Sequence, residues 1–491
     1  METTQAAKGK SAWDLMAAYF HDFGVLKETR KEYWGIQIIN FLDCTFYFAL
    51  LTIATVFLSE DLGLDDKQAG YATAIFTSAT SLMLFVSGLC TDWLGIKKSL
   101  TLSMLAMLAL RVGVVVVGVV PSLPHRGLLA SVLFLLMAPF MAGIQTVFQS
   151  ACQRFTTKRS RSAGFNLWYL FMNIGAAAAG FSIDIIRKLL HLHNVHVFTL
   201  GAILAVLCLV VGWMTIRQES QLVGPDETPA TQVAEAKVSR KPPWQAIREV
   251  VSEPTLWRLL VLIALILGVR AVYAYLYLLM PKYWLRTIGP DAAFGTLNAI
   301  NPIGIVIGLI LFIPIANKFN VFSMLIYGAM ISAFSLFPLA LPWRLFGSDI
   351  ASAHYWMALV CMFIVTVGEV AWSPKLYEYT AAIAPKGQEG TYLGLSLLPW
   401  FLAKTLVSAF SGHMLEYWSP ETVVIDGVKM PLQQAMIEGR LSYWHRPEAM
   451  WLMLGLYAFA GCVLAVFLRG WLTRGARLEP ARAEGPDVKG A

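Results

Sequence analysis

The stretch GLCTDWLGIKK, residues 88–98, is a short polar segment that separates two long apolar runs. Gly88 and Gly95 permit a tight turn and a close approach between helices, because glycine carries no side-chain carbon. We expect Asp92 to meet the positive end of a neighbouring helix or a basic side chain. The pattern therefore predicts two apolar helices joined by a tight turn. Lys97 and Lys98, which directly follow this turn, are expected to face water.

The composition indicates that lipid surrounds most of the chain. Of the 491 residues, 57% are hydrophobic and 14% are charged, and the mean hydropathy is +0.60. A soluble protein carries about 25% charged residues, because Lys, Glu, Arg and Asp are rarely buried. We therefore expect an all-α membrane protein.

The apolar runs are long enough to cross a bilayer, which takes about 20 residues. The twelve predicted spans are 34–58, 69–93, 99–120, 127–152, 162–186, 196–216, 257–281, 293–317, 320–342, 353–377, 391–414 and 448–469. A polar, proline-containing segment divides them into two sets. The predicted organisation is an N-terminal amphipathic segment at 1–33, a six-helix bundle at 34–216, a linker at 217–256, a second six-helix bundle at 257–469 and a tail at 470–491. The first segment is expected to lie on the membrane surface or to form a solvated helix.

The net charge of +7 is distributed as membrane topology requires. If the N-terminus is cytoplasmic, most Lys and Arg residues fall on the cytoplasmic side, which follows the positive-inside rule. We therefore predict a multi-pass protein of the inner or plasma membrane with both termini, the linker and the tail in the cytoplasm. The basic residues form no single patch, which argues against nucleic-acid binding.

Several other classes of protein lack sequence support. The six cysteines lie within or beside apolar runs and form no CxxC pair. His191, His193 and His196 crowd one loop without a nearby carboxylate, so we predict an ordinary interfacial loop and no metal site. No phosphate-binding GxxxxGK[ST] segment and no nucleophile–base constellation is evident. We expect no cofactor, no ATP-driven pumping and no enzymatic activity.

Three further stretches resemble the motifs of a known transporter family. They are FNLWYLFMNIG at 165–175, LNAINP at 297–302 and GEVAWSP at 368–374. They are similar to motifs in spans five, eight and ten of the proton-dependent oligopeptide transporters, and residues 88–98 resemble the loop motif of the wider major facilitator superfamily. The resemblance implies a major facilitator fold, in which two six-helix bundles rock around a central site. It also implies that Gly88, Asp92, Gly95, Lys97 and Lys98 form a gating motif that latches one state.

The chain departs from that family at the groups that bind the peptide carboxylate. Cys44 stands at the arginine position of the span-one motif, where Asp43 is the surviving carboxylate. Gln145 stands at the lysine position of span four. The glutamate expected in span seven is absent, and Arg270 lies in that region. The resemblance therefore implies ancestry and architecture more than it implies a peptide as substrate.

A few ionisable residues fall inside predicted spans, where a charge costs at least about 2.5 kcal/mol and needs a partner or a watery cavity. They are Asp43, Arg111, Arg270, Glu369 and Lys404. Glu369 is our main candidate for a proton-linked or amine-binding group, and Asp43 for a supplementary coupling group. Glu369 and Lys404 lie on adjacent spans, which leaves two alternatives: an ion pair, or joint binding of a zwitterionic solute. For Glu369, an ion pair that only stabilises the fold is a further alternative. For Arg111, the alternative is a structural role in the wall of the central cavity.

The remaining candidates are neutral or basic groups. Asn173 and Asn301 would be costly in hydrocarbon without partners, and the family resemblance places both at the cavity. Interhelical hydrogen bonding alone is the alternative. Arg270 and Lys404 are predicted to contact an anionic part of the solute, and a structural role is the alternative for Arg270. The predicted substrate-binding set is Asn173, Arg270, Asn301, Glu369 and Lys404.

We predict a monomeric secondary active transporter that moves a small polar solute, peptide or amino-acid-like, by alternating access. Coupling to protons as a symporter is the first hypothesis, with the solute, protons and membrane lipid as the partners. Export of a metabolite or drug by proton antiport is the second, because the family's span-one arginine and span-four lysine are replaced. A sensor that kept a transporter fold without transport is the third.

Overall fold

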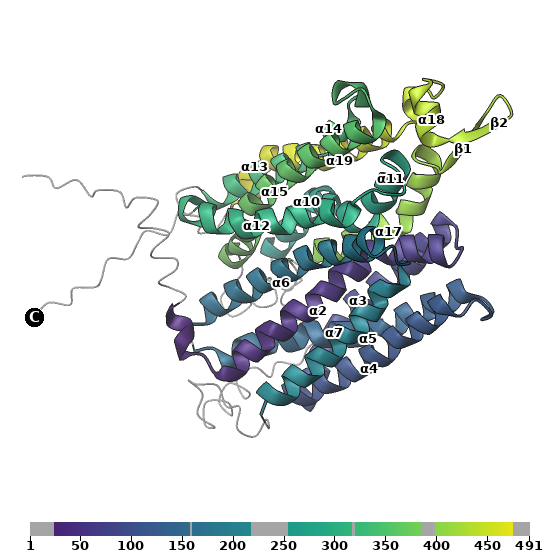
Figure 1. Cartoon of the computed structure of the whole chain (residues 1–491). Helices are drawn as coiled ribbons and strands as arrows, with labels where there is room; N and C mark the ends of the chain where they lie inside the picture. The colour runs from purple at the N-terminus through teal and green to yellow at the C-terminus, as the bar shows by residue number, and fades with distance from the viewer. Residues whose placement is uncertain are drawn as a thin grey trace, which may run out of the picture.

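The computed structural model describes residues 24–157, 160–217, 254–316, 320–383, 396 and 398–474. Most of the predicted N-terminal segment, linker and tail lies outside these residues. The described helices run roughly side by side along one direction (Figure 1). In the described part, nine helices are long and apolar enough to cross a membrane.

The helices before residue 217 form what we call the N-terminal group. Its long helices are α2 (Lys31–Val56), α3 (Asp66–Leu94), α4 (Ile96–Val119), α5 (Arg126–Phe155), α6 (Arg161–Asp184) and α7 (Val195–Thr215). Short turns flank them: η1 (Gly24–Glu28), η2 (Phe57–Asp61) and η3 (Ile185–Leu189). Asp65 begins α3 through a capping box in which its carboxylate accepts from the backbone N–H of Gln68 and the Gln68 side chain accepts from the backbone N–H of Asp65. Gly95 separates α3 from α4 with φ of 84°, which confirms the predicted tight turn.

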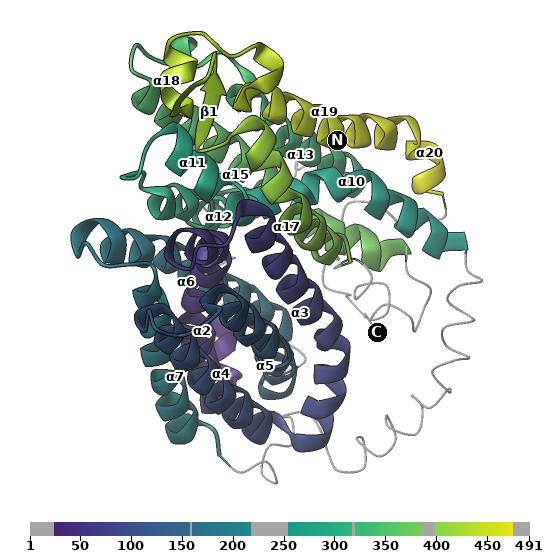
Figure 2. The same ribbon diagram turned by 90° about the vertical axis from the view of Figure 1, so that its right-hand side faces the viewer.

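The helices after residue 253 form the C-terminal group. Its long helices are α10 (Pro254–Leu278), α12 (Phe294–Ala316), α13 (Val321–Phe334), α15 (Ile350–Ile383), α17 (Leu398–Trp418) and α19 (Pro447–Phe467). The shorter ones are α11 (Met280–Thr287), α14 (Phe337–Ala340), η5 (Trp343–Leu345), α18 (Leu432–Ile437), η6 (Tyr443–His445) and α20 (Arg469–Leu472). Figure 2, which looks roughly along the helices, shows the two groups as neighbouring clusters.

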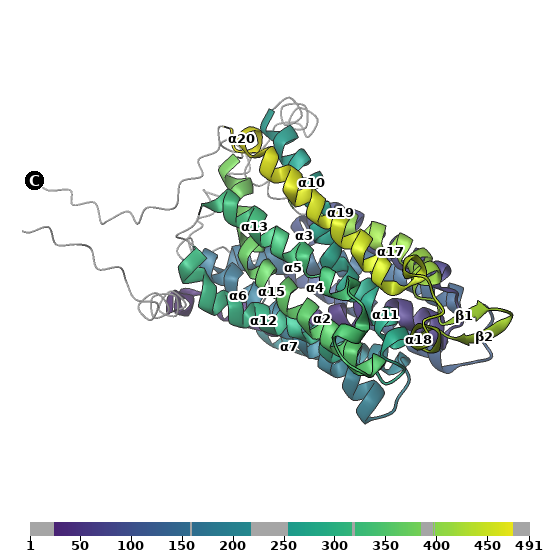
Figure 3. The same ribbon diagram turned by 90° about the horizontal axis from the view of Figure 1, so that it is seen from above.

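A two-stranded hairpin marks one end of the molecule, which we call the hairpin end. Strands β1 (Thr422–Ile425) and β2 (Val428–Pro431) pair antiparallel with Val423 opposite Met430. Asp426 and Gly427 form the turn with φ of 52° and 77°, as a two-residue hairpin loop requires. We did not predict these strands between the spans expected at 391–414 and 448–469, although Asp-Gly is a hairpin signal. Figure 3 shows the hairpin beyond the helix ends.

Small residues bring the two groups into close contact toward the hairpin end. A Cβ placed on Gly412 of α17 would lie 2.3 Å from the backbone oxygen of Asp66 on α3. A Cβ on Gly180 of α6 would lie 2.2 Å from the backbone oxygen of Gly295 on α12. These glycines let the helix backbones approach closely, which is a common means of association in membranes. The α3–α17 and α6–α12 contacts therefore define the boundary between the groups.

The predicted spans agree with the observed helices to within a few residues, apart from two interruptions. Span seven ends at Leu278 and continues as the separate helix α11, which carries Lys282 and Arg286. The span predicted at 320–342 breaks after Phe334 and resumes in α14, where Pro338 lies in the first turn. Part of the predicted span 391–414 precedes the described start of α17.

Candidate functional site

The central polar cluster forms around Glu369 on α15. Asn301 on α12 donates from Nδ2 to Glu369 Oε2 at 3.0 Å and to Thr366 Oγ1 at 3.3 Å. Glu369 also lies close enough to Arg270 on α10 for their charges to interact. The structure therefore brings together Glu369, Asn301 and Arg270, three of the predicted substrate-binding residues, from three helices of the C-terminal group.

Arg270 stacks on an aromatic ring instead of bonding to a carboxylate. Its guanidinium carbon lies 4.4 Å from the centre of the Trp372 ring, a cation–π contact. The indole Nε1 of Trp372 donates to Tyr273 Oη at 2.9 Å and to Ser332 Oγ at 3.1 Å, which fixes the ring. Arg270 is 8% exposed, and its Nε and Nη2 atoms have no hydrogen-bond partner among the residues that the structure describes. Trp372 belongs to the quoted GEVAWSP stretch, but we assigned it no role from the sequence.

Lys404 on α17 is buried at 3% exposure among aromatic rings. Its ammonium nitrogen lies 5.5 Å from the centre of the Trp400 ring and 5.4 Å from that of Phe401. Within the described residues no ion pair joins Lys404 to Glu369, whose Oε2 accepts from Asn301 instead. The first of the two alternatives for this pair, a direct ion pair, is therefore not formed in this conformation. Joint binding of a zwitterion stays a prediction.

The N-terminal group contributes α6 to the surroundings of the central cluster. Tyr169 lies within electrostatic range of Glu369 and Arg270. Asn173, one turn further along α6, donates from Nδ2 to the backbone oxygen of Tyr169 at 2.9 Å. Asn173 is thus satisfied within its own helix, and its predicted contact with a solute stays a prediction.

Asp43 and Arg111 form a buried pair inside the N-terminal group. Arg111 Nη2 donates to Asp43 Oδ1 at 2.9 Å, and Nη1 donates to the backbone oxygen of Gly201 at 2.7 Å. The guanidinium lies 3.9 Å from the centre of the Phe46 ring. The side chains are 1% and 0% exposed. This geometry favours a structural role for Arg111. It pairs Asp43, the supplementary coupling candidate, with a cation of its own group, while Asp43 Oδ2 is buried without a hydrogen-bond partner in the described residues.

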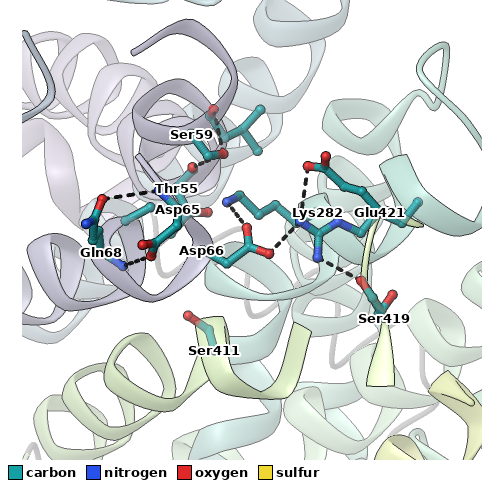
Figure 4. Close-up of polar contacts among 12 residues, drawn as sticks. Thr55, Ser59, Asp65, Asp66, Gln68, Lys282, Ser411, Ser419 and Glu421 are labelled. Atoms are coloured by element: carbon teal, nitrogen blue, oxygen red, sulfur yellow. Dashed lines mark hydrogen bonds and ion pairs between the residues drawn. The ribbon is translucent and has the colours of Figure 1, made fainter. Parts of the chain in front are cut away.

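A second charged cluster joins the two groups at the hairpin end; we call it the hairpin-end cluster, and it consists of Asp66, Lys282, Arg286 and Glu421. Lys282 Nζ lies 2.6 Å from Asp66 Oδ1, and Arg286 Nη2 lies 2.6 Å from Asp66 Oδ2. Arg286 also bonds to the backbone oxygen of Ser419 at 2.7 Å and to Glu421 Oε1 at 3.3 Å. Figure 4 shows Lys282 directed at Asp66 across the boundary. Burial lowers the pKa of Lys282, and the negative charge of Asp66 opposes that shift.

We did not predict the hairpin-end cluster from the sequence. From the sequence we assigned no role to Lys282, Arg286 or Asp66. The sequence does contain an indication of this cluster. Lys282 and Arg286 directly follow span seven on the predicted outer side of the membrane, where basic residues are rare. A cavity of about 340 Å³ lies beside this cluster, with lining residues Ser59, Glu60, Arg187, Lys282, Leu285, Arg286, Pro290 and Glu421.

Further contacts join the groups toward the hairpin end. Asp184 of α6 accepts from the backbone N–H groups of Gly295 and Thr296, at 3.2 and 2.6 Å, and so caps the positive end of α12. Ser78 of α3 bonds to Thr405 of α17 at 2.9 Å. In the described parts of these helices, no hydrogen bond joins α3 to α17 or α6 to α12 nearer the opposite end. These contacts hold the two groups together at the hairpin end, which is therefore closed.

The predicted gating motif is described only in part. Gly95 makes the turn, and Lys97 and Lys98 lie in the first turn of α4 with Lys98 exposed. The backbones of Gly88 and Asp92 belong to α3, but the side chain of Asp92 lies outside the described residues. Its predicted latching contact stays a prediction.

Long apolar helices in two groups, with buried ionisable side chains near their boundary, define a polytopic membrane transporter. A sequence model of the Major Facilitator Superfamily matches residues 36–408. The chain therefore belongs to this superfamily, and it is a transporter and not an enzyme. A search among curated protein sequences finds no match.

Solved structures of transporters share the fold. The peptide transporter POT in complex with sulfate is 16% identical, with a TM-score of 0.66 over 95% of this chain and 100% of that chain. A structure addressing substrate recognition in proton dependent oligopeptide transporters is 14% identical, with a TM-score of 0.66 over 91% and 99%. A D-xylose-proton symporter is 14% identical, with a TM-score of 0.61 over 91% and 97%. These likenesses show the major facilitator fold and its resemblance to the oligopeptide transporters.

Proposed function

We propose that this protein is a proton-coupled secondary transporter of a small polar solute, peptide or amino-acid-like, that works by alternating access. The observation that carries the proposal is the setting of Glu369. This carboxylate lies in a membrane-spanning helix, accepts a hydrogen bond from the neutral Asn301 and interacts with the charge of Arg270. A carboxylate with no direct ion pair in the described residues is able to take up and release a proton during a transport cycle.

Glu369 and Arg270 link proton binding to solute binding in this scheme. When Glu369 is ionised, its charge attracts Arg270 and competes with any other anion. When Glu369 is protonated, that attraction disappears and the guanidinium is available to the anionic end of the solute. Proton and solute therefore bind together and leave together, which is the requirement for symport.

The hairpin-end contacts support an alternating-access mechanism. The charge bias of the sequence predicts that this end faces outward, with both termini in the cytoplasm. The ion pairs of Asp66 then close the outer side, and the structure represents a conformation closed to the outside. Opening requires α3 to separate from α11 and α17, as expected when one group rocks against the other. We further propose that a single chain is the transporting unit.

The test is uptake into proteoliposomes after a thermal-shift screen of dipeptides, amino acids, nucleosides and sugars has identified a solute. Glu369→Gln is expected to abolish proton-driven accumulation while exchange of solute across the membrane persists. Glu378→Gln is the matched control, because this exposed glutamate of the same helix pairs with Lys375. Unchanged accumulation by Glu369→Gln would show that Glu369 does not couple transport to protons.

Proton-antiport export of a metabolite or drug is the second candidate. It is favoured by Cys44, which is buried and donates its thiol to Asn40 Oδ1 at 3.3 Å where the resembling family has an arginine. Without that cation, the groups that fix a peptide carboxylate in the N-terminal group are missing. The direction of solute movement under an imposed pH gradient distinguishes the two candidates.

A further inference from the structure

Arg270 has two N–H groups that no other side chain or backbone oxygen in the described residues accepts from. They are on Nε and Nη2, which are buried and lie on the same side of the planar guanidinium. Two parallel N–H groups in this arrangement match the two oxygens of a carboxylate. Arginine stays charged in proteins, so the free edge belongs to a full positive charge that is 92% buried, since the residue is 8% exposed.

The surrounding residues keep this edge free. The face of the guanidinium rests on Trp372 at 4.4 Å, and an indole ring occupies none of its N–H groups. Tyr273 and Ser332, which bond to each other at 2.6 Å, both accept from the Trp372 N–H. Glu369 is the nearby carboxylate, but no ion pair joins it to Arg270 in the described residues, and Asn301 donates to it. Arg270 is therefore oriented without being neutralised.

The buried cations of the two groups differ in their partners. In the C-terminal group, Lys404 on α17, which lies among the Trp400 and Phe401 rings, is a second buried cation without an ion pair in the described residues. In the N-terminal group, Cys44 and Gln145 are neutral, and the buried Arg111 is already paired with Asp43. Beside Glu369, an entering carboxylate therefore finds Arg270 on the C-terminal side, whereas Cys44 and Gln145 stand where the resembling family has its cations on the N-terminal side.

We propose that Arg270 binds a carboxylate of the transported solute side-on through Nε and Nη2, with Trp372 as the positioning residue that Tyr273 and Ser332 hold in place. The proposal rests on the proposed function and makes it more specific: the solute carries a carboxylate, and its acidic end lies against the C-terminal group. The neutral or cationic end then faces α6, where Tyr169 lies within range of the same residues.

The test compares acids with their amides. Purified full-length protein is titrated with alanine and alaninamide, with alanylalanine and its C-terminal amide, and with N-acetylalanine and its amide, and binding is followed by thermal shift and calorimetry. We expect at least one acid to bind about tenfold or more tightly than its amide. Arg270→Gln is expected to abolish that preference, and Arg270→Lys to weaken it because lysine has no two-pronged edge.

The matched control is Arg344→Gln. Arg344 also stacks on a tryptophan, Trp343 at 4.9 Å, but it lies at the surface near the hairpin end. This variant should keep the full preference for acids. Trp372→Phe retains an aromatic ring but loses the bonds to Tyr273 and Ser332, and we expect it to lower the acid-to-amide ratio several-fold while the protein still folds. That ratio reports orientation of Arg270 independently of stability.

Three outcomes would overturn the proposal: binding of none of the acids, equal binding of acids and amides, or a preference that survives Arg270→Gln. Failure of the proposed function looks different. In that case the acids bind with the expected preference, but neither accumulation nor exchange occurs in proteoliposomes. Conversely, proton-driven uptake with an unchanged acid preference in Arg270→Gln would leave transport intact and contradict the role of Arg270.

Discussion

Asp66 and Lys282 form a 2.6 Å ion pair between α3 of the N-terminal group and α11 of the C-terminal group, although 216 residues separate them in the chain. The Lys282 side chain is 4% exposed and that of Asp66 is 18% exposed. Arg286 binds the second oxygen of the same carboxylate. Asp66 therefore bonds to two cations of the opposite group at the closed end.

We predict that Asp66→Asn shifts the protein toward a conformation open at the hairpin end. The substitution leaves Lys282 buried without its carboxylate and Arg286 with only Glu421 and the Ser419 backbone oxygen, at a cost of about 3 kcal/mol, which corresponds to roughly a hundredfold change in population. The measurement is labelling of Ser411→Cys by a membrane-impermeant maleimide. Ser411 is buried beside Gly70 at the α3–α17 contact, so its labelling rate should rise sharply.

The neighbouring pair of Lys67 and Glu416 provides the control for that prediction. It also joins α3 to α17, at 2.6 Å, but its side chains are 40% and 57% exposed. Exposed pairs contribute about 0–1 kcal/mol, so Glu416→Gln should change the labelling rate little. Equal effects of Asp66→Asn and Glu416→Gln would show that burial of the Asp66 pairs does not close this end.

A methyl group on Gly412 is expected to act at the same boundary by steric means. Its Cβ would lie 2.3 Å from the backbone oxygen of Asp66. A backbone atom, unlike the end of a side chain, cannot move away by a change of rotamer. Gly412→Ala should disfavour the closed conformation by about 1–3 kcal/mol and raise labelling at Ser411→Cys. Gly113→Ala is the control, because its Cβ would meet the Leu133 side chain at an ordinary 3.4 Å. If both variants label at the wild-type rate, the glycine contact is not required for closure.

Removal of Arg111 is expected to destabilise the protein strongly. Arg111→Met leaves the Asp43 carboxylate buried without its partner, and breaking a buried pair in this way costs about 3–5 kcal/mol. The double variant Asp43→Leu, Arg111→Met should recover much of that loss because no charge is stranded. Thermal unfolding in detergent measures both effects.

The same variants address whether Asp43 takes part in coupling. If the pair is structural, the double variant should keep proton-driven accumulation per folded molecule. Loss of coupling with normal solute exchange in the double variant would instead support the role for Asp43 that the sequence suggested.

The positions of the spans were predictable because the bilayer acts on each segment separately. A run of about 20 apolar residues is sufficient to identify a span, and the observed helices begin and end close to those runs. The Gly95 turn was predictable for a similarly local reason, since only glycine adopts its backbone conformation readily. The motifs at 165–175, 297–302 and 368–374 further indicated the family.

The partners of the charged residues were not predictable in the same way. The sequence placed Glu369 and Lys404 on adjacent spans and left an ion pair open, but the structure bonds Glu369 to Asn301 and surrounds Lys404 with aromatic rings. Which side chains meet depends on how each helix is rotated about its axis and shifted along it. Those quantities are set by packing against neighbouring helices.

The amino-acid sequence by itself therefore determined that the chain is an all-helical membrane protein, where its spans lie and which few charges must avoid lipid, because each of these follows from the cost of exposing polar groups to hydrocarbon. Its motifs, through their resemblance to a known family, indicated a transporter. Tertiary structure alone decided that Asp43 pairs with Arg111, that Asp66 closes the hairpin end with Lys282 and Arg286, and that Trp372 leaves one edge of Arg270 free. Those pairings join residues far apart in the chain, and they exist only once the helices have packed in one register.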